Sequence, residues 1–212
     1  MALTSRKDFS SEQSVSGPEG DTEMRNFEDV LCDFASKDNE GWSVENIERA
    51  GVELGRNSYP ALLWNLNQLR PLRPEVAAVV VPSAWSGAEF PNRQLSGKRW
   101  RLLFDIAGYT VDGVPSPLPT STLRLWRGAI PKYRRGWSWT DDRERAQWFA
   151  TRNALLTGPD DEVVWVADVQ PDRLLAKITE LRGESEYVVD ARGLKVTDSR
   201  DRGPGGDEQA PG

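Results

Sequence analysis

Histidine is missing from this sequence of 212 residues, and its absence excludes several kinds of chemistry. Ser-His-Asp and Cys-His catalytic systems need an imidazole, so this chain can use neither. Zinc sites that depend on histidine are excluded for the same reason. Any catalysis must therefore use carboxylates, hydroxyls, arginine, lysine, tyrosine or backbone groups, and we expect no metal.

Cysteine occurs once, as Cys32. One cysteine can form neither an internal disulfide nor a thiolate cluster. A single free thiol fits a reducing compartment. We expect a cytoplasmic protein, with delivery into a host cell as the alternative.

Long hydrophobic runs are also missing. The longest apolar run is Val76–Val81, whereas a helix that spans a membrane needs about 20 apolar residues. Residues 1–24 are polar and lack the apolar middle of a signal peptide. We therefore expect no membrane partner.

The charge balance is acidic, with 27 Lys and Arg against 33 Asp and Glu, which gives a net charge of −6. An acidic chain does not favour binding to nucleic acid through its overall charge. A local basic patch would still allow such a partner, so nucleic acid stays an open but less favoured choice.

Composition divides the chain into four parts. Residues 1–24 and 199–212 are rich in small and charged residues without apolar periodicity, so we expect two disordered tails. Residues 25–114 have the apolar spacing of amphipathic helices. Residues 115–198 contain short runs typical of strands. The sequence predicts an α+β protein, with an amino-terminal helical region followed by a mixed β core that carries one packed helix.

Helix signals are clear in the region 25–114. Ser43 and Pro74 suit the start of a helix, and Gly108 suits an end. The helix that Pro74 opens is expected to cover the apolar run as far as Val81. Val52 is expected on the buried face of the helix that follows Ser43.

Strand signals follow a proline-rich segment near residue 115. One helix is expected among them at about 141–153, because Asp141 and Glu144 have the spacing of a capping box. The expected strands are Leu123–Arg127, Val163–Val169, Leu174–Ile178, Tyr187–Val189 and Leu194–Val196.

The first polar group in an unusual place is Arg127. Side chains alternate between the faces of a strand, so Arg127 shares a face with Leu123 and Leu125 and points inward with them. A buried guanidinium needs an anionic partner, which is either an internal carboxylate or a ligand. Gly128 follows and allows another backbone or a ligand to come close.

A second group is Glu184-Ser185-Glu186, which runs into an apolar strand. Glu184 and Glu186 share one face, about 7 Å apart at their Cα atoms. Two carboxylates this close repel each other, which favours a cationic group between them. The alternative is a solvated strand end.

A third group is the segment Ser138-Trp139-Thr140, just before the expected helix. Ser138 and Thr140 share a face if the segment is extended. Capping of the helix by Thr140 or Asp141 would explain one hydroxyl group but not both.

These three groups, in this order, resemble the Arg–Ser–Glu branch of the mono-ADP-ribosyltransferases. In that family an Arg ends the first core strand, a Ser-x-Ser/Thr segment opens the second, and a Glu-x-Glu or Gln-x-Glu precedes an apolar strand. The match covers about residues 120–198. The pattern Pro171-x-x-Leu-Leu-Ala-x-Ile178, followed by Arg182-Gly-Glu-Ser-Glu186, also looks like that of small bacterial and phage members. The usual Ser-Thr-Ser of the family is Ser-Trp-Thr here.

The resemblance implies an enzyme that cleaves the bond between nicotinamide and ribose in NAD, which is a substrate. It implies that Glu186 binds the ribose 2′-hydroxyl and stabilises the cationic transition state, and that Arg127 holds the pyrophosphate or the nicotinamide-side ribose. Ser138 would orient Glu186, Thr140 would shape the nicotinamide pocket, and Gly128 would offer backbone groups to the amide.

The residue at the position of Glu184 correlates with the acceptor in this family, and Glu at this position accompanies transfer to protein arginine. The resemblance therefore implies a toxin-like, phage-derived or regulatory enzyme that modifies arginine. Two alternatives stay open. In the first, the same fold transfers ADP-ribose to a nucleic acid or a small molecule, or hydrolyses NAD. In the second, the chain is a binding or structural protein without catalytic activity.

Overall fold

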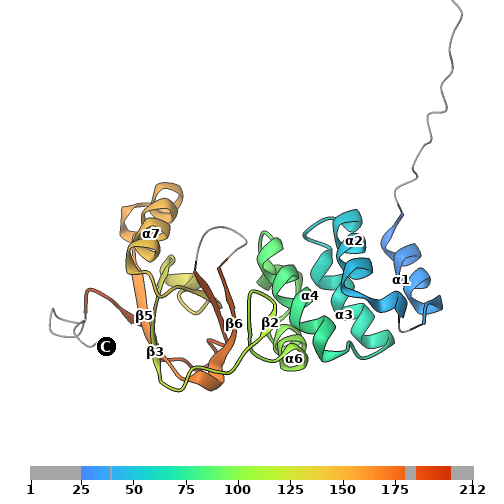
Figure 1. Ribbon diagram of the computed structural model, residues 1–212. Coiled ribbons are helices and arrows are strands. Elements are labelled where there is room, and N and C mark those ends of the chain that lie inside the picture. The colour runs from blue at the N-terminus through green and yellow to red at the C-terminus, as the bar shows by residue number, and fades with distance from the viewer. Residues whose placement is uncertain (1–24, 39, 180–184, 202–212) are drawn as a thin grey trace, which may run out of the picture.

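The computed structural model describes residues 25–38, 40–179 and 185–201. Helices occupy most of the first half of these residues, and all the strands follow them together with one long helix, which confirms the expected α+β class (Figure 1). The helices of the first half are α1 (Phe27–Ser36), α2 (Val44–Leu54), α3 (Tyr59–Leu69), α4 (Pro74–Gly87), α5 (Pro91–Gln94) and α6 (Gly97–Ala107).

Short polar residues begin several of these helices. The Ser43 hydroxyl accepts a hydrogen bond from the backbone N–H of Asn46 at 3.3 Å, so Ser43 caps α2 as expected. Pro74 lies in the first turn of α4, where its missing N–H is not needed. Gly108 ends α6 with a φ of +70°, a conformation that favours glycine.

Two expectations for the helices are wrong. Helix α4 does not end at Val81 but continues through Pro82 to Gly87. Ala84 and Trp85 lie beyond this proline and are buried, and their burial offsets its cost of about 3 kcal/mol. Val52 is 83% exposed, because the buried face of α2 is formed by Ile47 and Ala50.

The strands form two sheets. The five-stranded sheet has the order β2-β1-β6-β7-β4, and the three-stranded sheet has the order β3-β5-β8. Their bounds are β1 (Thr110–Val111), β2 (Val114–Pro115), β3 (Leu123–Gly128), β4 (Ser138–Trp139), β5 (Val164–Val169), β6 (Leu174–Ile178), β7 (Glu186–Val189) and β8 (Thr197–Asp198). Single 3₁₀ turns lie at Glu40–Trp42, Pro131–Tyr133, Pro159–Asp161 and Pro171–Arg173.

The expected strand at Leu194–Val196 is wrong. A turn at Gly193, with a φ of +70°, precedes it, and pairing with β5 begins only at Thr197. Leu194 and Val196 are instead partly buried side chains that pack against the core. Their apolar character therefore comes from packing and not from a place in a sheet.

The segment from Ser138 to Thr140 joins the two sheets. Ser138 and Trp139 pair with β7 in the five-stranded sheet. The next residue, Thr140, forms an antiparallel bridge with Trp126 of β3, with backbone hydrogen bonds of 2.8 and 2.9 Å. This segment brings the ends of β3, β4 and β7 together.

The five-stranded sheet is covered on both faces. Tyr187 and Val189 of β7 pack with Leu125 and Ala167 of the three-stranded sheet. Val188, between them in sequence, belongs to the cluster of the helices on the opposite face. Alternation along β7 therefore points Glu186 and Val188 toward the helices.

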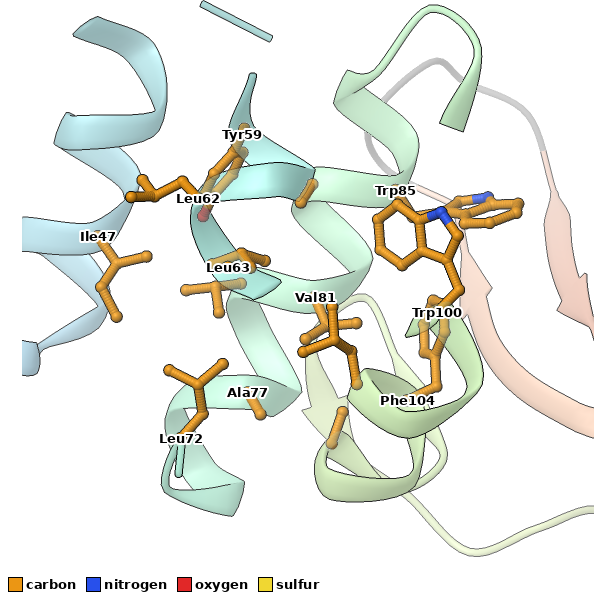
Figure 2. Packing of buried hydrophobic residues seen from close by; sticks show 14 of the residues in the cluster. Ile47, Tyr59, Leu62, Leu63, Leu72, Ala77, Val81, Trp85, Trp100 and Phe104 are labelled. Carbon is orange, nitrogen blue, oxygen red and sulfur yellow. The ribbon is translucent and has the colours of Figure 1, made fainter. Parts of the chain in front are cut away.

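The core of the helices, part of which is shown in Figure 2, is continuous with side chains of this sheet. Ala176, Ile178 and Val188 of the sheet belong to the same cluster as Leu63 and Val81 of the helices. Strands β1 and β2 begin before residue 115, so the sheet includes the last residues of the region expected to be helical. The division of the chain at 114/115 stays a prediction.

The remaining helix, α7 (Arg143–Thr157), packs on β3 and lies above the β core in Figure 1. Ala146 and Ala150 form its buried stripe against Trp126 and Val164. Within the described ranges, no helix is both long enough and apolar enough to cross a membrane.

Asp190 links the β core to the helices and gives a pH-dependent prediction. Its carboxylate accepts hydrogen bonds from Arg192 at 2.5 Å and from Arg101 of α6 at 3.3 Å, and its side chain is 3% exposed. The hydrogen bonds from Arg192 hold the pKa of Asp190 below its ordinary value of 3.8. A lowered pKa contributes stability above the unfolded-state pKa, and this contribution is lost as the pH falls through the folded-state pKa.

We expect Asp190→Asn to lower the free energy of unfolding by about 1.5–3 kcal/mol at neutral pH, because charged hydrogen bonds are lost. As the pH falls through the lowered pKa of Asp190, the wild-type carboxyl is protonated too, so the difference between the two proteins should shrink. Urea unfolding from neutral pH down through the acid range measures this. A difference that stays constant over the whole range would contradict the assignment.

Candidate functional site

A cavity of about 280 Å³ lies where β3, β4 and β7 meet α4 and α7. Its lining includes five of the six residues singled out in the sequence: Arg127, Gly128, Ser138, Thr140 and Glu186. They come from three strands and the bridge between the two sheets. The sixth, Glu184, lies outside the described residues, so its carboxylate is not placed beside that of Glu186.

Arg127 is held at the end of β3 by backbone carbonyl groups. Its Nε donates to the carbonyl oxygen of Tyr133 at 3.2 Å, and its Nη1 donates to that of Ser138 at 2.5 Å. No ion pair joins it to a carboxylate of the described residues, so the alternative of a structural ion pair gains no support. Burial lowers the pKa of Arg127 to about 10, and the negative charge of Glu186 raises it in part. The group is still a cation at neutral pH.

Gly136 lies directly against this guanidinium. A Cβ atom at Gly136 would be 2.3 Å from Nη2 of Arg127, so any larger residue would displace the side chain. The loop between Pro131 and Gly136 therefore fixes the direction in which the arginine points.

Gly128 is needed because α7 passes very close to β3. A Cβ atom at Gly128 would be 2.0 Å from the carbonyl oxygen of Ala146 and 2.4 Å from the backbone nitrogen of Ala150. Asn153 of α7 also donates a hydrogen bond to the carbonyl oxygen of Gly128 at 3.2 Å. The close approach that this glycine predicts is thus made by a helix. Its contact with nicotinamide stays a prediction.

Thr140 and Ser138 have different surroundings. The Thr140 hydroxyl accepts a hydrogen bond from the backbone N–H of Asp142 at 3.0 Å and supports the start of α7. Ser138 is half-buried, and no hydrogen bond joins its hydroxyl to Glu186 among the residues described. The expected role of Ser138 in orienting Glu186 therefore stays a prediction.

The expected cap of α7 is displaced by one residue. Asp142, not Asp141, accepts the hydrogen bond from the backbone N–H of Arg145, at 3.0 Å. Asp141 instead accepts a hydrogen bond from the Tyr187 hydroxyl at 3.2 Å and lies 3.7 Å from Nζ of Lys177. The Thr140 hydroxyl accepts a hydrogen bond from the N–H of Asp142, and this local turn delays the start of the helix by one residue. Residue spacing alone does not predict this turn.

Glu186 receives its hydrogen bond from a residue that the sequence analysis assigned to no site. The indole N–H of Trp85 in α4 donates to Oε1 of Glu186 at 3.0 Å. The two residues are 101 positions apart, and no motif connects them. Only the packing of the helices on the five-stranded sheet brings them together.

A larger cavity of about 700 Å³ adjoins the first and shares Arg127, Gly128, Ser138 and Asn153 with it. Three further cations, Arg93, Lys132 and Arg135, line this second cavity. Their side chains are exposed, and no ion pair is found for them within the described part of the chain.

Among the described residues of its lining, the acidic one is Glu89, whose carboxylate is paired with Arg56 at 3.1 Å. The cations of this described lining therefore outnumber its available carboxylates. The two cavities together form a cleft whose larger part suits an anion.

Comparisons of the chain with protein-family models, with curated proteins and with solved structures find no match. The function is therefore inferred from the geometry of the residues above.

Proposed function

We propose that this protein is an NAD-dependent mono-ADP-ribosyltransferase with an ADP-ribosyltransferase type of β core. The observation that supports it most is the convergence of Arg127, Ser138, Thr140 and Glu186 on one cavity. They come from three strands and the bridge between the two sheets, and they follow one another in the order of the Arg–Ser–Glu motifs. An accidental set of short motifs has no reason to meet around one cavity.

The site offers the electrostatics that cleavage of NAD needs. When the bond between C1′ of the ribose and the nicotinamide nitrogen breaks, its electron pair leaves with nicotinamide, and positive charge develops on the ribose. The carboxylate of Glu186 would stabilise that charge and accept a hydrogen bond from the 2′-hydroxyl. The acceptor nucleophile then forms a bond to C1′ and gives up a proton.

The two-part cleft suits a molecule made of two nucleotides. The nicotinamide riboside would occupy the smaller cavity beside Glu186, and the adenosine part the larger one. Arg127 lines both cavities and would hold the pyrophosphate between them. Arg93, Lys132 and Arg135 add positive charge around the larger cavity, where the phosphates would enter.

Protein arginine is the acceptor that Glu184 favours. A guanidinium is a weak nucleophile until a carboxylate orients it and takes a proton. We expect Glu184→Gln to lower transfer to arginine strongly while NAD hydrolysis is kept, because Glu186 is untouched. Release of nicotinamide and labelling of protein, measured in parallel, separate the two activities. Equal loss of both would contradict this division of roles.

Incubation of the protein and a cell lysate with NAD labelled on its adenine side tests the function. Label on protein that hydroxylamine removes supports transfer to arginine. Label on nucleic acid, or release of nicotinamide without labelling, supports the alternative acceptors. If no nicotinamide is released under any condition, the proposed activity is wrong and a binding or structural role is left.

A further inference from the structure

Trp85 contacts the carboxylate on which the proposed function depends. Its Nε1 donates to Oε1 of Glu186 at 3.0 Å, and Trp85 is 1% exposed. Indole is a donor only, so it can hold a carboxylate oxygen without competing for a proton. Among the described residues no second donor is found for Glu186, so Oε2 can accept a hydrogen bond from a sugar hydroxyl.

The indole of Trp85 is fixed by three other rings. It meets Trp100 and Phe104 of α6 edge to face, with centroids 5.1 and 6.0 Å away, and stacks on Trp137 at 5.8 Å. Figure 2 shows Trp85, Trp100 and Phe104 on the side of the helical cluster that faces the strands. Because these rings restrict the indole, the direction of its N–H bond is also restricted.

The carboxylate needs such support. Glu186 begins β7 and is only half-buried, and glutamate has three rotatable bonds between backbone and carboxylate. Catalytic groups lose rate when their orientation is loose, since the transition state needs one geometry. Within the described part of the chain, Ser138, the expected partner, makes no hydrogen bond with Glu186, whereas Trp85 does.

We propose that Trp85 is a positioning residue that holds the carboxylate of Glu186 for NAD cleavage. The helical region then supplies part of the active site and does more than cover the sheet. Ser86, the next residue of α4, supports this assignment because it also lines the cavity. The inference rests on the proposed function.

Trp85→Phe removes the donor and keeps an aromatic ring. Trp42→Phe is a matched control, because Trp42 is also buried in the same cluster but donates to the carbonyl oxygen of Phe34, at 2.9 Å, and its ring packs against Phe34 and not against Trp85. Both variants lose an indole hydrogen bond and similar packing. We expect Trp85→Phe to lower kcat for nicotinamide release by about 10–100-fold with little change in KM for NAD. Trp42→Phe should lose similar thermal stability and keep kcat.

A spectroscopic measurement tests the contact without any enzyme assay. The indole N–H resonance of Trp85, identified by its absence from Trp85→Phe, should move upfield in Glu186→Gln, because a neutral amide is a weaker acceptor than a carboxylate. The N–H resonance of Trp42, which donates to Phe34, should not move.

Three results would overturn the proposal. The first is an unchanged kcat in Trp85→Phe, and the second is an equal loss of kcat in both tryptophan variants. The third is an indole N–H resonance of Trp85 that does not shift in Glu186→Gln. Each of the first two requires an active wild-type protein, so it leaves the proposed function standing. A wild-type protein that releases no nicotinamide refutes the proposed function, and the positioning role with it.

Discussion

Glu186→Gln is expected to lower nicotinamide release from NAD by about 10²–10³-fold, the cost of removing one preorganised electrostatic stabiliser. The amide keeps the size of the side chain but not its negative charge, so it cannot stabilise a cationic ribose. Transfer and hydrolysis should fall together, because both need the same bond to break. The measurement is nicotinamide release under single-turnover conditions at saturating NAD.

The fold should survive this substitution, since the amide oxygen of Gln can still accept the hydrogen bond from Trp85. Glu75→Gln is a suitable control, because Glu75 lies at the start of α4, the helix that carries Trp85, and its side chain is 66% exposed. It makes the same chemical change away from the cavity. Wild-type turnover by Glu186→Gln would refute the mechanism.

Gly128→Ala is expected to cause the largest loss of stability, about 3 kcal/mol. The added methyl group would lie 2.0 Å from the backbone oxygen of Ala146, and a helix backbone cannot move aside as a flexible side chain can. Either α7 moves away from β3 or the strand is distorted, and both changes open the buried contact between Ala146, Ala150 and Val164. Urea unfolding with an unchanged m value measures the loss.

Gly87→Ala provides the comparison. A Cβ atom at Gly87 meets nothing within 4 Å, and the residue is the last of α4. Alanine favours helix over glycine by up to about 1 kcal/mol, so this variant should be neutral or more stable. If both glycine variants behaved alike, the close packing of α7 on β3 would not explain Gly128.

Local signals predict much of the secondary structure. Ser43, Pro74 and Gly108 mark helix ends in the sequence because their preferences come from their own backbone and side-chain hydrogen bonds. Strand alternation likewise places Leu125 inside and Arg127 on the same face, at the cavity. These features depend on residues a few positions apart.

Long-range features are the ones that the sequence does not predict. The hydrogen bond between Trp85 and Glu186 and the contact between Gly136 and Arg127 need the tertiary fold. The larger cavity is formed by side chains from the helices and the β core, so its cations cannot be grouped by spacing alone. Val52 shows the converse, since an apolar residue at helical spacing is exposed when no neighbour covers it.

The bridge that Ser138-Trp139-Thr140 makes between the two sheets has a thermodynamic consequence. A molecule that contacts both Arg127 of the three-stranded sheet and Glu186 of the five-stranded sheet could bind only while the two sheets remain packed together. Its binding would therefore couple the unfolding of one sheet to that of the other. Its binding free energy would add to the stability of the whole β core, in proportion to the logarithm of its concentration above Kd. Melting of this half of the molecule should then remain a single cooperative event that shifts upward as the cleft fills.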